Sequence, residues 1–541
     1  MTSLDRPWRR GGAARYAVER VRLAVRPPVE VGPLPPGVRK DEDAEIAVRD
    51  GTILRANLYR QADGAPLPAI VSAHPYGKDR LPRRTRGGHF RLNPQFRILR
   101  QTGRIRISSE TGWEAPDPAF WVPRGFALVN LDLRGAGRSD GVGSLLSEQE
   151  GEDIHDVIEW VAAQPWCDGN VGMLGVSYLA MSQYRAAAAA PPHLRAIVPW
   201  EGLTDAYHDL FYPGGVPEIG FSRVWTAGVR RVARMEPDLG AEAPRHPDDD
   251  SFWRALRPPL GRVTVPMLVC GSFSDHDLHS RGSVRAFRGV ASDDRHLYTH
   301  RDGKWAAFYG DEAKAAQLAF LERHLKGAPR EIPRVRLEVR ERGDRVVEVR
   351  EEADWPLPHA EERVLWLAPQ GRLTADSPQA RETLELNPRR WAATFRWTFD
   401  EDTEVTGDAM LRLWMRGHPA GDAHVFAGIS KWVDGRFVPF EGSYGFGRDL
   451  VASGWRRVAL SPATATQVGV EFGPSATIFR AGEELRLHVS GRQLSPRNPL
   501  WGAAPGLYRA TPRARWLLEW GPERKAGLLL PVVPPRAPTV P

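Results

Sequence analysis

One serine of this chain stands where a short apolar run meets an Ala-rich stretch. In "GMLGVSYLAMSQYRAA", residues 172–187, Ser177 lies at the junction of a predicted strand and a predicted helix. A serine hydroxyl becomes a nucleophile only when a histidine accepts its proton and a carboxylate orients that histidine. The pattern therefore predicts covalent chemistry at Ser177 if the chain supplies these partners, and a small polar core residue if it does not.

The acid and the histidine are expected later in the chain, each at the C-terminal end of a strand of a parallel α/β sheet. Asp275 in "VPMLVCGSFSDHDLH" is the expected acid, with Asp277 as its competitor, and His300 ends the strand "RHLYTH". Asp275 could instead cap the helix that follows it. The order serine, acid, histidine nevertheless predicts one site built from Ser177, Asp275 and His300.

Three other histidines are alternative candidates for the base. His276 and His279 lie too near Asp275 along the chain to supply a separate strand end. His296 begins its strand, so its side chain is expected at the opposite edge of the sheet. The sequence therefore favours His300.

A developing oxyanion needs preorganised donors about 3 Å away. The backbone N–H of Tyr178 is one candidate, and the hydroxyl of Tyr76 in "VSAHPYGKDR" is the other, with aromatic packing as its alternative role. Leu179 occupies the last glycine position of G-x-S-x-G, and Ala180 follows one residue later. We expect Ala180 to serve as the small residue that lets the helix pack against the strand.

The segments around these residues alternate between strand and helix patterns. Short apolar runs between turn residues are typical of buried strands, and residues 151–166 carry apolar side chains at helical spacing. This alternation predicts a mostly parallel sheet covered by helices, preceded by a hairpin about Asp50–Gly51. The predicted strands are 67–74, 126–133, 171–176, 194–200, 265–271 and 295–300, and a further helix is predicted over 311–325.

Two stretches depart from this alternation of strand and helix patterns. Residues 201–257 are rich in aromatic and turn-forming residues, which predicts a small cap over the strand ends. After about residue 330, polar and apolar residues alternate between turn signals, as in an all-β sandwich. The predicted organisation is an N-terminal arm over 1–44, an α/β unit over 45–200 and 258–330, the cap over 201–257, and a β domain over 331–541.

Composition narrows the function classes. The chain has 541 residues, 42% of them hydrophobic, which is enough for a large core. Its net charge is +7, but the basic residues are spread along the chain beside 67 acids, so no nucleic-acid partner is predicted. The basic segment 78–106 is expected to be a solvated loop face, with an anion-attracting surface as the alternative. No apolar run approaches the roughly 20 residues that span a bilayer, and the twin-Arg start lacks an apolar segment, so we expect a cytoplasmic protein without a membrane partner.

Other chemistries find little support in the sequence. Cys167 and Cys270 are the only cysteines, and neither stands at a metal-like spacing from a histidine. The stretch "GAGRSDG" has Asp140 where a dinucleotide-binding G-x-G-x-x-G needs its third glycine. We therefore predict no cofactor and no metal.

Several stretches together resemble a known family. "PWCDGNVGMLGVSYLA", with "SAHPYG", "LDLRGAGRSDG", "CGSFSDHD" and "YTH", is similar to the bacterial cocaine esterase and X-prolyl dipeptidyl aminopeptidase family of serine hydrolases, which includes α-amino acid ester hydrolases. The resemblance runs from about residue 45 to the C-terminus. It implies an α/β-hydrolase sheet with a short inserted cap, followed by a C-terminal all-β jelly-roll sandwich. It also implies that Ser177, Asp275 and His300 form a triad with Tyr76 and Tyr178 as the oxyanion hole, and that small carboxylic esters are cleaved through an acyl-enzyme.

Alternatives remain open at this point. In the α-amino acid ester or amide branch a carboxylate cluster grips the substrate ammonium, and Asp209 and Asp277 could form such a pair, although Leu278 stands where a third acid is expected. An X-prolyl-type peptidase is a further alternative, and so is a non-catalytic binding protein whose β domain holds a sugar or a protein. The sequence leaves a homodimer open. Candidate substrate-binding aromatics, each equally compatible with core packing, are Trp200, Phe211, Trp225, Phe273 and Trp305.

Overall fold

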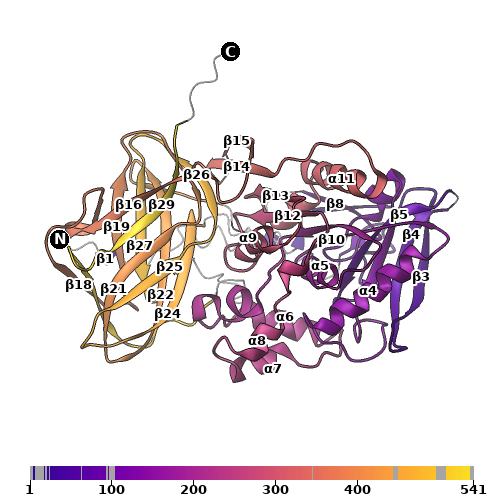
Figure 1. The fold of residues 1–541 in the computed structure, drawn as a ribbon, viewed down its shortest axis with the longest axis horizontal. Helices are drawn as coiled ribbons and strands as arrows, with labels where there is room; N and C mark the ends of the chain where they lie inside the picture. The colour runs from indigo at the N-terminus through magenta and orange to yellow at the C-terminus, as the bar shows by residue number, and fades with distance from the viewer. Residues whose placement is uncertain are drawn as a thin grey trace, which may run out of the picture.

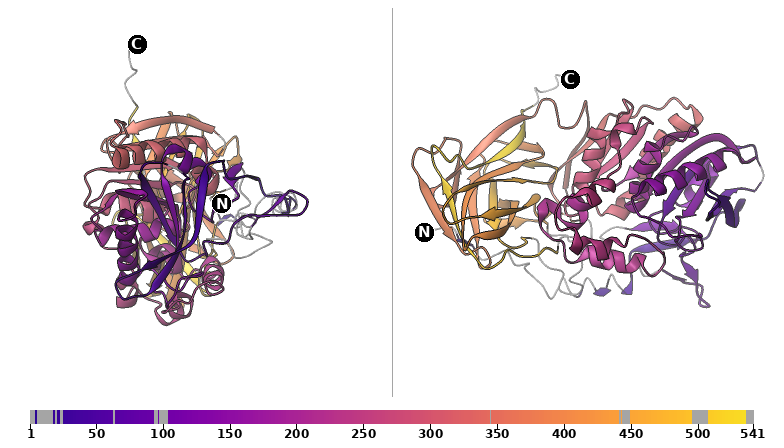
Figure 2. Two further views of the ribbon diagram at one scale, coloured as in Figure 1. Left: turned by 90° about the vertical axis from the view of Figure 1, so that its right-hand side faces the viewer. Right: turned by 60° about the horizontal axis from the view of Figure 1, so that its bottom comes forward.

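A computed structural model describes most of the chain. The described residues are 4–5, 18, 21–22, 25–62, 64–92, 96, 104–343, 345–440, 442, 449–494 and 507–535. An α/β unit and a β-rich unit lie side by side along the long axis of the molecule (Figures 1 and 2).

The α/β unit is built on one mixed sheet whose central strands are parallel. Its strand order is β3-β4-β9-β5-β10-β11-β12-β13-β14, with antiparallel pairing only at β3–β4 and β4–β9. Strands β5, β9 and β11 to β13 are almost wholly buried, as expected for a sheet covered on both faces. The bounds are β3 (Val38–Ala47), β4 (Ile53–Gln61), β5 (Leu67–His74), β9 (Ala127–Asp132), β10 (Cys167–Val176), β11 (Leu194–Trp200), β12 (Met267–Ser272), β13 (Arg295–His300) and β14 (Val335–Arg342).

Helices cover this sheet and carry site residues at their first turns. The predicted helix at 151–166 is observed as α4, which starts three residues earlier with Ser147 as its cap. The hairpin about Asp50–Gly51 is confirmed, with Gly51 at φ 82°. The bounds are α3 (Pro118–Trp121), α4 (Glu148–Ala162), α5 (Tyr178–Ala188), α9 (Ser280–Gly289), α10 (Lys304–Phe308) and α11 (Asp311–Lys326).

The segment between β11 and β12 forms a small helical layer, as predicted for a cap. It contains a single π-helical turn, Tyr207–Phe211, followed by three short helices along the lower edge of Figure 1. The helices are α6 (Phe221–Val229), α7 (Leu239–Glu242) and α8 (Ser251–Ala255). Trp225 in α6 donates its indole N–H to the Tyr76 hydroxyl at 3.1 Å and so reaches the candidate site.

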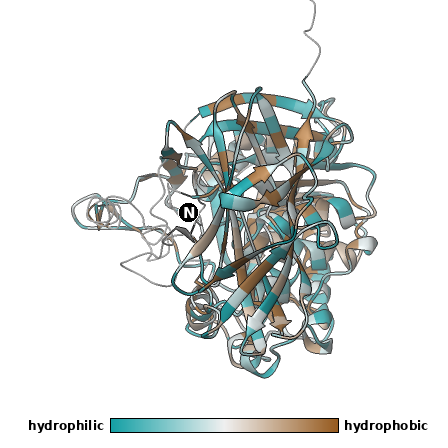
Figure 3. Ribbon diagram, turned by 90° about the vertical axis from the view of Figure 1, so that its left-hand side faces the viewer, coloured by the Kyte–Doolittle hydropathy of each residue, from teal (hydrophilic) through white to brown (hydrophobic). Residues whose placement is uncertain are grey.

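The β-rich unit is a sandwich of two antiparallel layers. Strands β19, β27, β22 and β24 pair in that order in one layer, and β18, β28, β21 and β25 in the other. Buried and more exposed residues alternate along β18, β21, β25 and β27, and the buried residues of the unit form one core. Figure 3 shows hydrophobic and hydrophilic residues interspersed on this side of the molecule. The bounds are β15 (Arg345–Glu352), β16 (Glu361–Ala368), β17 (Arg372–Thr374), β18 (Glu382–Leu386), β19 (Ala392–Thr398), β20 (Thr403–Gly407), β21 (Met410–His418), β22 (Gly421–Val433), β23 (Arg436–Val438), β24 (Ala452–Leu460), β25 (Thr466–Glu471), β26 (Ser475–Phe479), β27 (Glu484–Ser490), β28 (Arg515–Trp520) and β29 (Gly527–Val533).

The ends of the two units differ from the predicted bounds. Strand β3 begins at Val38, inside the predicted N-terminal arm, and residues 29–32 (β2) pair with residues 105–108 (β8). Strand β14 lies in the predicted β domain, but it extends the α/β sheet by pairing with β13 and also contacts β26. Hydrogen bonding of the backbone therefore runs continuously from one unit into the other.

Part of the basic segment 78–106 is described. Lys78 is buried against Asp43 and Asp79, and the short strands β6 (Arg83–Arg84) and β7 (Phe90–Arg91) form an exposed hairpin. Residues 93–95 and 97–103 lie outside the described residues, so the choice between a solvated face and an anion-attracting surface stays a prediction.

Candidate active site

Ser177 sits at a sharp turn between β10 and α5. Its backbone has φ 59° and ψ −114°, a conformation that residues other than glycine rarely adopt. The turn is held on both sides, because the Ser177 N–H donates to the carbonyl of Trp200 at 3.0 Å and the Ser177 carbonyl accepts from Met181. Strained backbone of this kind concentrates at functional sites, where it lifts one side chain out of the sheet.

Two glycines explain how this turn accommodates the departure from G-x-S-x-G. A Cβ on Gly175 would lie 2.3 Å from the Cβ of Leu179, so the leucine fits only because residue 175 has no side chain. A Cβ on Gly202 would lie 2.8 Å from the Cβ of Ala180. The expected small residue at position 180 is thus in close contact with the end of β11, and the tight packing of α5 is kept.

Ser177 and Asp275 are brought together through His279. The Ser177 Oγ lies 3.2 Å from Nε2 of His279, and Nδ1 of the same ring lies 2.5 Å from Oδ2 of Asp275. The backbone N–H groups of Leu278 and His279 both donate to the Asp275 carbonyl, so residues 275–279 form one helical turn in front of α9. Positions i and i+4 of such a turn share a face, which places the acid and the histidine side by side.

A buried lysine completes this cluster. Lys304, the first residue of α10, has a fully buried side chain, and its Nζ lies 2.7 Å from Oδ2 of Asp275 and 2.7 Å from Nδ1 of His279. Burial alone would raise the pKa of the Asp275 carboxyl, but the charges of Lys304 and His279 outweigh burial and hold that pKa below its usual range. Burial, and then the charge of Lys304, lower the pKa of the His279 imidazole.

The structure does not bring His300 to Ser177, which corrects the predicted choice of histidine. Its Nδ1 accepts a hydrogen bond from the backbone N–H of Asp302 at 3.1 Å, so Nε2 carries the proton. That Nε2–H donates to Oε1 of Glu201 at 3.1 Å, and the ring stacks on Trp200. Both ring nitrogens are thus occupied by groups other than Ser177.

The two predicted oxyanion donors lie beside Ser177. The Tyr76 hydroxyl accepts from Nε1 of Trp225 at 3.1 Å and is near enough to Ser177 for that side chain to influence its pKa. Burial raises the pKa of Tyr76 well above its usual range, so the phenol keeps its proton. The Tyr178 N–H is the first of α5 and has no acceptor within the helix.

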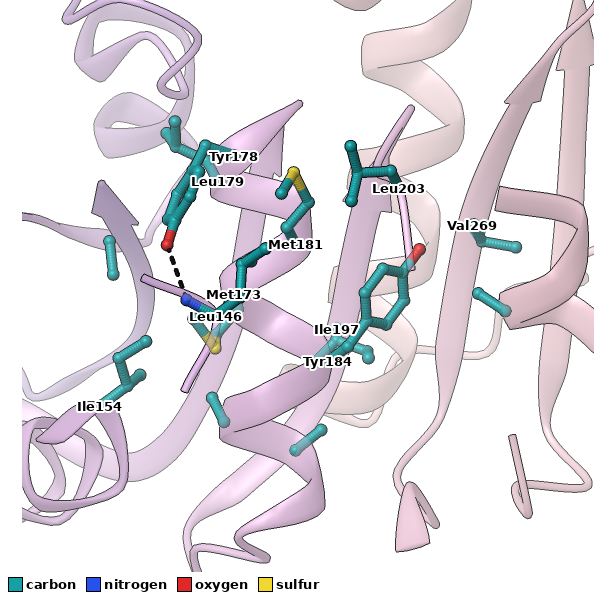
Figure 4. Packing of buried hydrophobic residues seen from close by; sticks show 14 of the residues in the cluster. Leu146, Ile154, Met173, Tyr178, Leu179, Met181, Tyr184, Ile197, Leu203 and Val269 are labelled. Atoms are coloured by element: carbon teal, nitrogen blue, oxygen red, sulfur yellow. Dashed lines mark hydrogen bonds between the residues drawn. The ribbon is translucent and has the colours of Figure 1, made fainter. Parts of the chain in front are cut away.

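The Tyr178 ring packs against Tyr76 and Trp225, and its hydroxyl is held away from Ser177. Its side chain points into the core, where the hydroxyl donates to Glu150 and accepts from the Leu146 N–H at 3.2 Å (Figure 4). Burial raises the pKa of Glu150 to about 7. These contacts fix the first turn of α5 and with it the direction of the Tyr178 N–H.

The predicted substrate-binding aromatics divide into two groups. Trp200 and Phe273 are almost fully buried and pack on Tyr298 and Trp355, respectively. Trp225 is half-buried and reaches the site through Tyr76. Their substrate-binding roles stay predictions, and the contacts of Trp225 support its role best.

Two further residues from the prediction lie in or beside the cap. Phe211 packs on Trp253 and borders a cavity of about 370 Å³ between the cap and the β-rich unit. Asp209 has a fully buried carboxylate that is ion-paired with Arg285 at 2.8 Å. This pairing leaves Asp209 poorly suited to the predicted partnership with Asp277.

Asp277 itself lies next to other acids. Burial, followed by the charges of Asp449 and Asp275, raises its pKa to about 8. The hydroxyl of Tyr508 in the β-rich unit reaches the backbone carbonyl of Asp277 at 3.4 Å. Asp277 is therefore a carboxyl at the junction of the two units rather than a partner of His279.

Glu114 is a site residue that the sequence reasoning missed. Its Oε1 accepts from Nε1 of Trp305 at 3.2 Å, its backbone has φ 64°, and burial raises its pKa to about 8. It contributes to the electrostatics of Tyr76 and Lys304. Nothing in "TGWEAPDP" distinguishes this glutamate from a surface acid, so the signal becomes visible only in three dimensions.

One group of side chains in the described part of the chain has donors close enough for a metal. These are Glu201, Cys270 and His300, whose donor atoms lie within 4.8 Å of one another. Burial raises the pKa of the Cys270 thiol well above its usual range, and Nε2 of His300 already donates to Glu201. The residues therefore fit a buried hydrogen-bonded cluster better than a set of metal ligands.

The fold and the serine turn define an α/β-hydrolase. A family model described as X-Pro dipeptidyl-peptidase (S15 family) matches residues 50–303, and one described as X-Pro dipeptidyl-peptidase C-terminal non-catalytic domain matches residues 327–499. The crystal structure of a CocE/NonD family hydrolase from Staphylococcus aureus is 30% identical, covers 95% of this chain and 100% of that chain, and has a TM-score of 0.85. The chain belongs to the CocE/NonD hydrolase family and is a serine hydrolase.

Two more proteins are similar to this chain at lower identity. The cocaine esterase of Rhodococcus sp. (strain MB1 Bresler) is 28% identical over 428 residues, which are 68% of this chain and 69% of that protein. An α-amino acid ester hydrolase structure shares the fold, with a TM-score of 0.67 at 17% identity over 92% of this chain and 97% of that one. In the described part of the chain, no helix is both long and apolar enough to cross a bilayer.

Proposed function

We propose that this enzyme hydrolyses small carboxylic esters, with Ser177 as nucleophile, His279 as general base and Asp275 as the acid that orients the base. The observation that carries the proposal is the continuous contact from Ser177 Oγ to Nε2 of His279 at 3.2 Å and from Nδ1 to Asp275 at 2.5 Å. The family membership supports an acyl-transfer reaction at this serine. His279 takes the place that the sequence had given to His300.

The first half of the reaction forms an acyl-enzyme. Ser177 Oγ attacks the ester carbonyl carbon while Nε2 of His279 accepts the hydroxyl proton. The carbonyl oxygen becomes an oxyanion that receives hydrogen bonds from the Tyr76 hydroxyl and the Tyr178 N–H. Nε2 of His279 then gives its proton to the leaving alcohol as the C–O bond breaks.

The second half releases the acid. A water molecule attacks the acyl carbon and transfers a proton to Nε2 of His279, and the same two donors hold the second oxyanion. Collapse of this intermediate breaks the bond to Ser177 Oγ, which recovers its proton from His279. Asp275 stays ionised throughout and stabilises the imidazolium that forms in each half.

Substitution of each histidine tests the assignment. On a 4-nitrophenyl ester, we expect Ser177→Ala and His279→Gln to lower kcat by at least about 10³-fold, because the members of a triad act as a unit. His300→Gln is the matched control and should keep kcat within about tenfold, with folding checked by circular dichroism. A folded His279→Gln variant that keeps wild-type kcat would contradict the proposal, and loss of activity in folded His300→Gln alone would return the base to His300.

A second candidate is hydrolysis of α-amino acid esters. The cluster of Asp277 with Asp449, together with the raised pKa of Asp277, favours it, because an entering ammonium group would ionise this carboxyl and pair with it. A matched pair of 4-nitrophenyl esters that differ only in an α-amino group separates the two functions. Preference for the plain ester supports the first proposal, whereas a preference for the amino ester that disappears in Asp277→Asn supports the second.

A further inference from the structure

Lys304 is a cation enclosed within the candidate triad. Its side chain is fully buried, which is rare for lysine unless the ammonium is paired. Its Nζ stands 2.7 Å from Oδ2 of Asp275 and 2.7 Å from Nδ1 of His279. The alkyl stem of the side chain enters from the first residue of α10, so the charge is held by a separate element from the turn that carries Asp275 and His279.

The contacts of His279 Nδ1 with Asp275 and with Lys304 allow two positions for the proton of the neutral imidazole. Nδ1 of His279 lies within hydrogen-bond distance of an acceptor, the Asp275 carboxylate, and of a donor, the Lys304 ammonium. If Nδ1 carries the proton, it donates to Asp275 and leaves Nε2 bare to accept from Ser177. If Lys304 donates to Nδ1 instead, the ring proton moves to Nε2 and the base cannot accept the serine proton. Catalysis by His279 therefore requires that Lys304 direct its hydrogen bond to Asp275.

We propose that Lys304 is a positioning residue that acts through Asp275 and His279: its ammonium shares Oδ2 of Asp275 with the His279 Nδ1–H, keeps this carboxylate ionised, and keeps the imidazole unprotonated in acidic solution. The inference rests on the proposed function, since it assigns the base to His279. It adds a residue whose contacts in the triad are with Asp275 and His279.

The groups around His279 together favour its unprotonated imidazole, as the proposal requires. Asp275 and Glu201 favour the imidazolium, whereas burial and the adjacent ammonium of Lys304 oppose it, and the pKa of His279 is lowered overall from its ordinary value of 6.5. Glu114 also faces Lys304, but burial raises its pKa to about 8, so it is mostly neutral at pH 7. A base with a depressed pKa is unprotonated at lower pH, and activity should persist there.

The pH dependence of kcat/KM tests this role. The acid limb reports the free base, so wild type should lose activity only below pH 6.5. Lys304→Met should move that limb to higher pH by about one unit or more, because the like charge that opposed the imidazolium is gone. Lys525→Met, which removes an exposed lysine of the β-rich unit, is the matched control and should leave the limb in place. Lys304→Arg, which retains a charge, should keep the limb closer to wild type than Lys304→Met does.

An acid limb that does not move in folded Lys304→Met would overturn the inference. Histidine ¹⁵N spectra of the wild-type enzyme give a second measurement that needs no folded variant: at pH 7, His279 should carry its proton on Nδ1, and a proton on Nε2 would overturn the inference as well. His279→Gln, assayed in parallel, separates the two levels. If His279→Gln is inactive while the acid limb of Lys304→Met stays at the wild-type pH, only the inference about Lys304 fails. If His279→Gln is active, the proposed function and the inference about Lys304 both fail.

Discussion

At the scale of single residues, a hydrogen bond from the cap sets the direction of a hydroxyl in the site. Indole N–H groups only donate, so Trp225 occupies a lone pair of the Tyr76 oxygen and leaves the Tyr76 O–H to donate in another direction. Trp225→Phe removes this constraint but keeps an aromatic ring. We expect kcat to fall about tenfold, or ~1.4 kcal/mol, with a smaller change in KM.

Steady-state kinetics on the 4-nitrophenyl ester provide the measurement. Trp253→Phe is the matched control, because its indole N–H donates to the backbone carbonyl of His246 within the cap. That variant should lose stability and keep kcat. If Trp225→Phe raised KM alone, Trp225 would contact the substrate without orienting Tyr76.

Single residues also mark how far the sequence could lead. Chain order was enough to select Ser177 and Asp275, which the structure places in one cluster with His279 between them. The expectation that the base ends a strand excluded His279, although the i, i+4 spacing of Asp275 and His279 is visible in "SDHDLHS". That spacing brings the two side chains together only if the residues are helical. The helical turn at 275–279 lies before α9, and no apolar periodicity in its sequence predicts it.

At the scale of elements, the turn from β10 to α5 depends on a glycine that faces the next helical turn. A methyl group on Gly175 would overlap the Leu179 side chain, so Gly175→Ala must push α5 away from the strand. We expect it to lower the free energy of unfolding by about 1–3 kcal/mol, the usual cost of overpacking, and to lower kcat because the Tyr178 N–H moves with α5. Urea denaturation and kcat report the two effects.

The control for this substitution is another strand glycine. A Cβ on Gly469 in β25 meets no atom within 4 Å, so Gly469→Ala should leave both stability and kcat nearly unchanged. Equal stabilities of the two variants would contradict the role assigned to the contact between Gly175 and Leu179.

Elements of the α/β sheet were the easiest part of the fold to predict. The runs at 67–74 and 194–200 coincide with β5 and β11, because buried parallel strands are largely apolar and end at turn residues. The less apolar run at 295–300 coincides with β13. The role of β14 was not predicted. Its alternating pattern fits any half-buried strand, and only tertiary structure shows that it joins both units.

At the scale of the whole molecule, the β-rich unit holds the loops that carry the candidate catalytic residues. Nε2 of His276 is 2.8 Å from the carbonyl of Pro474, and Arg281 donates to the carbonyl of Ser453 at 3.0 Å. Arg301, three residues before Lys304, donates to the carbonyls of Leu450 and Val451. Contacts with the β-rich unit thus hold both loops of the candidate site, the one after β12 and the one after β13.

Arg301 offers the sharpest test of this anchoring. Its guanidinium reaches two carbonyls and the Ser475 hydroxyl with a planar fork, whereas a lysine in its place keeps the charge but not the geometry. Arg301→Lys should lower the free energy of unfolding by about 2 kcal/mol through lost charge-assisted hydrogen bonds. It should also lower kcat several-fold, because the start of α10, and with it Lys304, is then less firmly held. Arg389→Lys, at an exposed position of the β-rich unit, should change neither quantity. If urea denaturation showed the loss of stability while kcat stayed at the wild-type value, the β-rich unit would support the fold without positioning the site.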